Sequence, residues 1–313
     1  MKILILGAGG IGGYFGGRLV EAGADVTFLV RPPRKARLDE LGLQIESCFG
    51  DITLPVKARL KSEIDSDYDL VVLTCKAYDL LDAIETIRPA MAGTAGVLPF
   101  LNGVAHIALL NERFGNDRVL GGVAKIAVML TPEGVIRHLN DWRTVTFGEQ
   151  DCSLSPRVIA FKALFDRTSV EARVSPDILR DTWLKLVHLH TVASMTCLMR
   201  ANVGEIVRTP DGKDLFGRVL DANIEIARHE GYTPDDDFIA TYRALFSQAD
   251  STYAASLLRD IERGGQIEAD HVLGFMLERC RAHGVEEHIH CLAYTSAKAY
   301  EQRRAAGRIG RGL

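Results

Sequence analysis

The sequence has no long apolar run, no Cys-x-x-Cys pair and no excess of positive charge. Charged residues at Arg18, Glu21 and Asp25 interrupt the apolar stretches near the N-terminus, whereas a membrane span needs about 20 apolar residues in succession. The apolar run after Lys2 is also shorter than the about 7 to 15 residues of a secretory signal. We therefore expect no membrane partner and a cytoplasmic location.

The cysteines and the charge balance disfavour other classes of protein. Six cysteines are scattered along the chain, which suits reduced thiols in the cytosol. The three histidines between Cys280 and Cys291 match no familiar zinc spacing, so we expect no metal. Because 37 Lys and Arg residues oppose 41 Asp and Glu residues, the net charge of −4 provides no positive field for nucleic acid. Small molecules are the expected partners.

The residues that are present indicate two domains of different class. At 313 residues the chain exceeds the about 250 to 300 residues that a single core usually reaches. Up to residue 174, short apolar runs alternate with helical patterns, which predicts an α/β domain with a parallel sheet. After residue 174 only helical periodicity remains. We expect an α/β domain over residues 1–174 and an all-α domain over residues 175–313.

The expected elements follow from periodicity and turn signals. Buried strands are expected at Ile3–Leu6, Asp25–Val30, Leu70–Cys75 and Val97–Leu101, and helices at Ile11–Val20, Tyr78–Ile87, Val104–Phe114 and Leu154–Arg167. Antiparallel strands added to the same sheet are expected at Val119–Leu130, Gly134–Leu139 and Thr144–Phe147. Ser175-Pro176-Asp177 is expected to start a helix with proline in its first position. The arginine-rich tail Arg303–Leu313 is expected to be a frayed, solvated end.

Glycine is unevenly distributed, since seven of 29 glycines lie between Gly7 and Gly17. Gly7, Gly9 and Gly12 have the Gly-x-Gly-x-x-Gly spacing, directly after a predicted strand and at the start of a predicted helix. In this context the three glycines permit a tight turn, a close approach of backbone to a diphosphate, and close helix–strand packing. The N–H groups at the helix start favour negative charge. The loop predicts a dinucleotide site, and glycines that serve packing alone are the alternative.

The end of the second predicted strand favours NADPH over NADH. An NAD site usually has Asp or Glu there, which accepts hydrogen bonds from the ribose hydroxyls. Here Arg31, Arg34 and Lys35 follow the strand, and no carboxylate is near. Cationic groups bind a 2′-phosphate through charge-assisted hydrogen bonds. A solvated, basic helix start is the alternative.

Two polar residues follow later strands of the predicted sheet. Lys76 comes after the strand that begins at Leu70, and Asn102 after the strand that begins at Val97. Ligands of α/β sheets bind at the carboxyl ends of strands, so both are candidates for the site. Either residue could instead cap a helix or lie in solvent, and a helix cap is the stronger alternative for Asn102.

Further short motifs follow the glycine loop and Arg31 in one order: Thr74–Ala77, Leu101–Val104, Trp183–Leu186, Ser256–Asp260, and Glu268–Asp270 six residues before Gly274. Together they resemble the ordered motifs of the ketopantoate reductase (2-dehydropantoate 2-reductase) family over nearly the whole chain. The resemblance implies a Rossmann-type domain followed by a helical domain similar to that of 6-phosphogluconate dehydrogenase. It also implies NADPH-dependent reduction of a 2-oxo acid, as in pantothenate biosynthesis.

The resemblance further implies roles for individual residues. Lys185 would be the general acid, and Asn102 and Glu268 would position the substrate and the lysine. Ser256 would bind the substrate carboxylate, while Lys76 would line the cofactor crevice. These residue types suit the chemistry, because hydride delivery to a ketone leaves an alkoxide that a nearby ammonium can stabilise and protonate. From the residues alone, surface or interhelix positions are the alternative for Lys185, Ser256 and Glu268.

One departure from the family pattern concerns the substrate. The family usually has asparagines four and eight residues after the lysine, whereas this chain has Leu189 and Ala193. Losing two amides removes directed hydrogen bonds, so the usual hydroxylated substrate should bind less well. His188, His190 and Thr191 are possible substitutes.

Three functions therefore stay open. The first is an NADPH-dependent 2-oxo acid reductase, with ketopantoate as the leading substrate and a homodimer as a possible assembly. The second is a reductase of the same plan for a less polar oxo substrate, favoured by Leu189 and Ala193. The third is a non-catalytic NADPH-binding regulator, which the presence of Lys185 and Glu268 disfavours.

Overall fold

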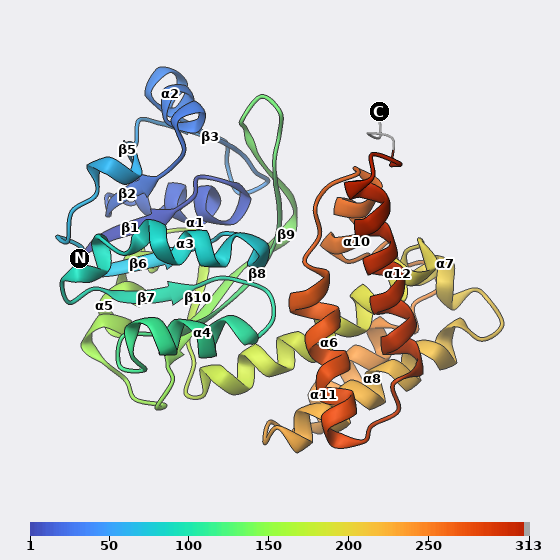
Figure 1. Cartoon of the computed structure of the whole chain (residues 1–313). Helices are drawn as coiled ribbons and strands as arrows, with labels where there is room; N and C mark the ends of the chain where they lie inside the picture. Colours follow the sequence, from blue (N-terminus) through green and yellow to red (C-terminus); the bar gives the residue numbers. More distant parts are fainter. Residues whose placement is uncertain (310–313) are drawn as a thin grey trace. The chain divides into compact units, whose positions relative to one another are not determined.

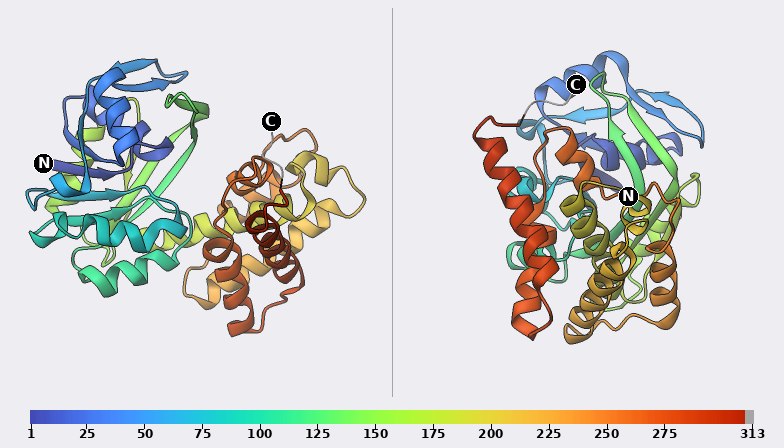
Figure 2. Two further views of the ribbon diagram at one scale, coloured as in Figure 1. Left: turned by 45° about the horizontal axis from the view of Figure 1, so that its top comes forward. Right: turned by 90° about the vertical axis from the view of Figure 1, so that its right-hand side faces the viewer.

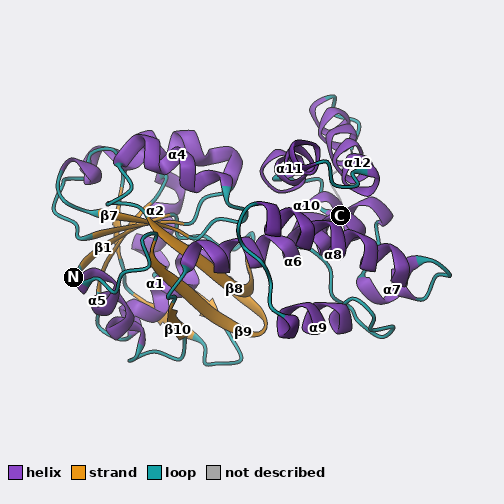
Figure 3. Cartoon of the chain, turned by 90° about the horizontal axis from the view of Figure 1, so that it is seen from below, coloured by secondary structure: helices purple, strands orange, loops and turns teal. Residues whose placement is uncertain are grey.

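The computed structural model describes residues 1–309, which form two compact units (Figure 1). The first unit spans Met1–Thr182 and the second begins at Trp183, so the division falls inside helix α6 (Ile178–Met199), a few residues beyond the boundary that the pattern predicts. Strands occur only in the first unit among the described residues (Figure 3). This is the predicted combination of an α/β domain and an all-α domain.

The first sheet is parallel and has the strand order β5-β2-β1-β6-β7. Its strands are β1 (Lys2–Leu6), β2 (Asp25–Leu29), β5 (Lys57–Arg59), β6 (Leu70–Leu73) and β7 (Gly96–Pro99). Side chains alternate between its faces, so Ile3 and Ile5 of β1 join one buried cluster while Leu4 joins another. Burial on both faces explains the continuous apolar runs.

Five α-helices belong wholly to the first unit: α1 (Gly10–Glu21), α2 (Pro32–Leu41), α3 (Leu80–Ile87), α4 (Ala105–Phe114) and α5 (Pro156–Phe165). Tyr14 and Phe15 of α1 and Phe161 of α5 pack in one of the two clusters. Ile84 of α3 and Leu110 of α4 pack in the other. The sheet is thus covered by helices on both faces, as in a doubly wound α/β domain.

The predicted antiparallel strands are present, but they belong to a second sheet rather than to the first one. That sheet has the order β10-β9-β3-β4, with β8 paired to β9. Its strands are β3 (Leu43–Glu46), β4 (Ile52–Leu54), β8 (Leu120–Leu130), β9 (Ile136–Glu149) and β10 (Glu171–Val174). β9 is one long strand where the pattern predicts two, because a register shift between Ile126 and Val128 of its partner bends the pair without ending it.

The second unit is built from α6 and six further helices, seen from two other sides in Figure 2. They are α7 (Val203–Val207), α8 (Gly212–His229), α9 (Asp236–Leu245), α10 (Ser256–Glu262), α11 (Phe275–His283) and α12 (His288–Ala305). A π-helical turn, Asp270–Gly274, precedes α11. No helix within residues 1–309 has the length and apolar content needed to cross a membrane.

Two expected helix ends were wrong. α6 begins at Ile178, and Asp177 is its cap, because Asp177 Oδ1 accepts a hydrogen bond from the Arg180 N–H at 3.0 Å. Pro176 therefore lies before the helix instead of in its first position. At the other end, α12 continues through Arg303 to Ala305 where a frayed tail was expected. The end of that tail, residues 310–313, lies outside the described residues.

Candidate active site

Four segments meet at the carboxyl edge of the first sheet. β2, β1, β6 and β7 run parallel and in register, so the residues that follow them share one edge. Arg31 follows β2, the glycine loop follows β1, Lys76 follows β6 and Asn102 follows β7. The chain reverses its direction of strand addition between β1 and β6, which is where open α/β sheets bind their ligands.

The three glycines of the fingerprint are needed for three different reasons. Gly7 has a φ of +97°, which disfavours other residues. A Cβ on Gly12 would lie 2.3 Å from the carbonyl oxygen of Gly7 and 2.4 Å from Thr74 Oγ1, so α1 packs on the strand ends only with glycine there. A Cβ on Gly9 would meet nothing within 4 Å. Packing within the chain therefore does not explain Gly9, whereas close approach of a ligand does.

The N-terminus of α1 suits an anionic group. Gly9 is the N-cap residue and provides no side-chain cap, and the first turn contains no acidic residue. The first N–H groups of a helix have no partner within it, and the helix dipole adds positive potential at this end. Together with the open space at Gly9, these features fit the diphosphate of a dinucleotide.

The basic residues after β2 do not act as one cluster. Arg31, the N-cap residue of α2, is exposed, and its side chain has no hydrogen bond or ion pair within residues 1–309. Lys35 Nζ is 2.7 Å from Asp39 Oδ2. Arg34 donates from Nε to the Ala8 carbonyl at 3.1 Å and from Nη1 to the Gly134 carbonyl at 2.8 Å. Of the three, Arg31 alone presents an uncommitted guanidinium at the surface.

Lys76 and Asn102 are both half-buried at the same edge. The helix-cap alternative for Asn102 was wrong, because α4 begins at Ala105 and its N-cap residue is Val104, with no side-chain cap. Gly103, at a φ of +81°, separates Asn102 from that helix start. The backbone of Lys76 caps the short 3-10 turn Ala77–Asp79, and its side chain does not. Both side chains therefore remain candidates for contact with a ligand.

In the helical unit, Lys185 and Glu268 form an electrostatic pair. Burial lowers the pKa of Lys185 to about 8, and the nearby Glu268 carboxylate opposes that shift. Glu268 is 5% exposed and lies just before the π-helical turn. The ring of Trp183, two residues before Lys185, lies 5.8 Å from that of Phe275, the residue after that turn. This packing brings α6 and the segment of Glu268 together.

Leu189 and Ala193 lie on the same face of α6 as Lys185, because the three residues are four apart. Leu189 is half-buried and Ala193 is 1% exposed. Ser256 is the first residue of α10 and is half-buried, and its hydroxyl has no hydrogen bond within residues 1–309. The positions four and eight residues after Lys185 on this helix face are thus apolar.

The suggested substitutes for the missing asparagines are all buried in the helical unit. His188 Nε2 lies 2.9 Å from the Tyr253 hydroxyl, and its ring stacks on Tyr242 with centroids 4.5 Å apart. His190 and Thr191 are fully buried in the core of the helical unit. Thr191 Oγ1 donates to the Val187 carbonyl at 2.8 Å, as helix back-bonding predicts. Their role in place of the missing amides stays a prediction.

A polar chain of hydrogen bonds in that core was not predicted. His290 Nε2 and Asn223 Oδ1 are 2.8 Å apart, and Asn223 Nδ2 donates to Thr191 Oγ1 at 2.8 Å. These hydrogen bonds connect α12, α8 and α6 through residues that are far apart in sequence. His190 stacks on His290, with ring centroids 4.6 Å apart. No pattern in the sequence could indicate these contacts, because they depend on how three helices pack.

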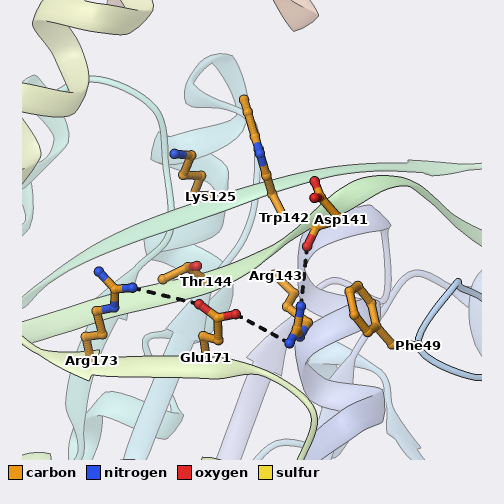
Figure 4. Close-up of a pocket in the computed structure, with 8 residues that line it drawn as sticks. All are labelled: Phe49, Lys125, Asp141, Trp142, Arg143, Thr144, Glu171 and Arg173. Carbon is orange, nitrogen blue, oxygen red and sulfur yellow. Dashed lines mark hydrogen bonds and ion pairs between the residues drawn. The ribbon is translucent and has the colours of Figure 1, made fainter. Parts of the chain in front are cut away.

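A separate pocket of about 530 Å³ lies on the second sheet, at the bend of the β8–β9 pair (Figure 4). Its cations already have partners: Arg143 lies 3.8 Å above the Phe49 ring centroid and 3.4 Å from Glu171, which is also 3.8 Å from Arg173. Lys125 lies 4.6 Å from the ring of Trp142. None of the strand-end residues described above lines this pocket, so we do not assign it to the active site.

Comparisons with known proteins agree on one family. The family model described as ketopantoate reductase PanE/ApbA matches residues 3–151, and the model of its C-terminal domain matches residues 177–301. An uncharacterized oxidoreductase, YkpB of Bacillus subtilis, is 32% identical over 301 residues, which cover 96% of this chain and 99% of that protein. The 2-dehydropantoate 2-reductase of Pyrococcus abyssi is 27% identical, with 96% and 98% covered.

A solved structure shows the same fold at lower identity. The ternary structure of D-mandelate dehydrogenase with NADH and anilino(oxo)acetate is 21% identical, with a TM-score of 0.84 over 97% of this chain and 99% of that one. The two family models together match most of the chain. One lies within the first unit of the structure, and the other lies mainly within the second. The protein belongs to the ketopantoate reductase family of oxidoreductases.

Proposed function

We propose that the protein uses NADPH to reduce a 2-oxo acid to a 2-hydroxy acid, with 2-dehydropantoate as the first substrate to test and pantoate as its product. The observation that carries the proposal is the half-buried Lys185, whose pKa falls to about 8 although the buried Glu268 carboxylate opposes that shift. A general acid works best when its pKa lies near the operating pH. The curated name of the Pyrococcus relative supports the choice of substrate.

The chain's own residues would bind the substrate and protonate it. A reduced nicotinamide, when bound, supplies a hydride to the carbonyl carbon. The Lys185 ammonium would stabilise the negative charge that develops on the carbonyl oxygen and then donate its proton there. Glu268 would keep that amine protonated, because its carboxylate raises the pKa of Lys185. Ser256 would bind the substrate carboxylate, and Asn102 would orient the substrate.

For the cofactor, Gly7, Gly9 and Gly12 would receive the diphosphate and Lys76 would line the crevice. The exposed Arg31 would bind the 2′-phosphate, and no carboxylate follows β2 to accept hydrogen bonds from the ribose hydroxyls. Both features support NADPH over NADH. Homodimer formation and a cytoplasmic location remain predictions of the same proposal.

A less polar oxo acid is the second candidate substrate. Leu189 and Ala193 replace the amides that usually follow the lysine, and His188, His190 and Thr191 are buried. An apolar surface rejects a hydroxylated substrate only weakly, but it offers that substrate no directed hydrogen bonds. A 2-oxo acid with an aliphatic or aromatic side chain would suit this surface.

A steady-state assay tests these proposals. The purified protein is given NADPH and a panel of 2-oxo acids that includes ketopantoate and less polar analogues, and NADPH consumption is followed by absorbance. If the kcat/KM of this protein for ketopantoate is comparable to that of known ketopantoate reductases, the second candidate substrate is excluded. Tight NADPH binding without turnover of any ketone would overturn the catalytic proposal and favour a non-catalytic regulator.

A further inference from the structure

The side chain of Arg34 joins three segments that are far apart in sequence. It belongs to the first turn of α2, and its Nε donates to the carbonyl of Ala8 in the glycine loop at 3.1 Å. Its Nη1 donates to the carbonyl of Gly134 at 2.8 Å. Gly134 lies in the turn between β8 and β9. One guanidinium thus links the glycine loop to the tip of a hairpin more than 100 residues away.

The hairpin tip is shaped to receive this guanidinium. Gly134 has a φ of +75°, and a Cβ there would lie 2.4 Å from Arg37 Nε and 2.8 Å from Arg34 Nη1. The turn is closed by hydrogen bonds from the Gly134 N–H to the Thr131 carbonyl at 2.9 Å and from the Thr131 N–H to the Val135 carbonyl at 2.8 Å. The carbonyl of Gly134 is therefore held at a fixed place, and only glycine allows the arginines so close.

The geometry also limits what Arg34 can do for a ligand. Its Nη2 is buried and has no hydrogen-bond partner within the described residues. Burial and the neighbouring Arg37 both lower the pKa of Arg34, as expected for a guanidinium removed from solvent. Nε and Nη1 each donate to a backbone carbonyl and Nη2 is covered, so the guanidinium is committed mainly to the chain itself.

The contact with Ala8 determines the direction of one peptide group. In a trans peptide the C=O and the following N–H point in opposite directions, so a carbonyl held by Arg34 turns the Gly9 N–H to the other side. Gly9 has no Cβ, and a Cβ there would meet nothing within 4 Å, so side-chain contacts at Gly9 do not fix the orientation of this peptide. Rotation would exchange a donor for a carbonyl oxygen, which repels phosphate.

We infer that Arg34 is a positioning residue for the cofactor: its guanidinium holds the Ala8–Gly9 peptide so that the Gly9 N–H faces the diphosphate. This inference rests on the proposed function, because it needs the glycine loop to bind NADPH. The diphosphate is common to NADPH and NADH. Arg34 therefore supports the binding of both cofactors, whereas Arg31 distinguishes them.

Four variants test the inference, with the dissociation constants of NADPH and NADH measured for each by fluorescence titration. Arg34→Lys keeps the charge but loses the planar fork of Nε and Nη1 that donates to the two carbonyls, and Gly134→Ala disturbs the same contact without changing any charge. Each should weaken NADPH and NADH by the same factor, about tenfold, as for loss of a charge-assisted hydrogen bond. At saturating cofactor and substrate, kcat should be unchanged, because only binding is affected.

The matched control is Arg118→Lys. Arg118 is also half-buried and also bridges backbone carbonyls, from Nε to Ala95 at 3.0 Å and from Nη2 to Met91 at 2.8 Å. Ala95 lies before β7, at the amino edge of the sheet, so this contact is remote from the glycine loop. Arg118→Lys should lower the thermal midpoint about as much as Arg34→Lys and leave both dissociation constants unchanged. A merely structural role of Arg34 predicts the same binding result for both variants.

The outcomes separate the alternatives. Equal weakening of both cofactors in Arg34→Lys and Gly134→Ala, with Arg31→Ala weakening NADPH alone, supports the inference. If Arg34→Lys and Gly134→Ala bind both cofactors like the wild type, the inference is overturned and the proposed function stands. Weakening of NADPH alone in Arg34→Lys also overturns it, since that result makes Arg34 a 2′-phosphate ligand. Failure of the wild type to bind either cofactor overturns the proposed function together with the inference.

Discussion

The buried Glu268 carboxylate raises the pKa of Lys185, while burial lowers that pKa to about 8. The two effects oppose each other, and burial is the larger. An ordinary lysine, with a pKa near about 10.4, is a poor proton donor at neutral pH. A lysine near 8 remains mostly protonated at pH 7 and yet releases its proton more readily. The surroundings of Lys185 thus bring the pKa of its amine to a value suited to acid catalysis.

The first prediction concerns the pH dependence of turnover. Reduction needs the Lys185 ammonium, so kcat should be constant at neutral pH and should fall as the pH rises through about 8. Glu268→Gln removes the charge that raises this pKa, so its kcat should fall at lower pH than that of the wild type. Lys185→Ala should lose about 10²- to 10⁴-fold in kcat while still binding NADPH. Near-normal turnover of Lys185→Ala would exclude it as the acid.

The second prediction concerns cofactor choice. Arg31 is exposed and its side chain is uncommitted within residues 1–309, so Arg31→Ala should weaken NADPH by about 10- to 100-fold, as for loss of a charge-assisted hydrogen bond. NADH, which lacks the 2′-phosphate, should bind almost as before. Titration with both cofactors measures the two constants. Equal weakening of both would contradict the assignment, and Lys35→Ala, which removes a lysine already paired with Asp39, is the matched control.

The third prediction concerns the substrate. Replacing Leu189 and Ala193 with asparagine should raise kcat/KM for ketopantoate relative to a less polar 2-oxo acid, because amides on the face of Lys185 can bind hydroxyl groups. The same change should lower stability by about 1 to 3 kcal/mol, since Ala193 is buried and an unpaired amide there is costly. Leu189→Met is the shape control. An unchanged ratio of kcat/KM values would show that these positions do not contact the substrate.

The fourth prediction concerns acid stability. Burial lowers the pKa of His290 to about 4, well below its ordinary value of 6.5. As the pH falls, His290 is therefore protonated in the unfolded chain at a higher pH than in the folded protein. Above about pH 6.5 this group should not affect stability, and the free energy of unfolding should decrease as the pH falls from there to about 4. The full loss should be up to about 3 kcal/mol. Denaturant unfolding across this pH range measures it.

His290→Gln provides the comparison for that measurement. Glutamine has no proton to gain in this range and can still donate to Asn223 Oδ1. Its stability should therefore change less between pH 6.5 and 4 than that of the wild type, although it should be lower at pH 7 because the stacking on His190 is lost. The burial of His190 lowers its own pKa in the same direction, so some dependence on pH should remain. Parallel curves for the two proteins would contradict the prediction.

Much of the α/β unit could be predicted because its signals are local. The run before Gly7 and the run at Leu70 are strands because apolar side chains must face cores on both sides of a sheet. The second sheet could not be predicted, since β3 pairs with β9, about 90 residues later. Loops of that length close at little extra entropic cost, so pairing of this kind leaves no spacing rule in the sequence.

The candidate site likewise contains features that local sequence patterns indicate and features that only the fold decides. The glycine loop, Arg31 and the motif around Lys185 are visible in the order of residues, since backbone conformation, helix dipole and charge type act within a few positions. Arg34 and Lys35 were expected to act with Arg31. The fold sets the Gly134 partner of Arg34, whereas Lys35 pairs with Asp39 four residues later on the same helix. Helix packing likewise directs His188 to Tyr253, a contact that the sequence does not indicate.

By itself, the sequence determined two domains, their classes, the strand–loop–helix that suits a diphosphate, and the residue types suited to proton transfer. Those properties depend on local conformation and on the periodicity of apolar residues. Only the tertiary structure decided which cations are already paired, how far the half-buried Lys185 is shielded from solvent near Glu268, and which carbonyls Arg34 holds. Burial and hydrogen bonding across long separations are properties of packed elements, and they set both the pKa of an acid and the direction of a peptide.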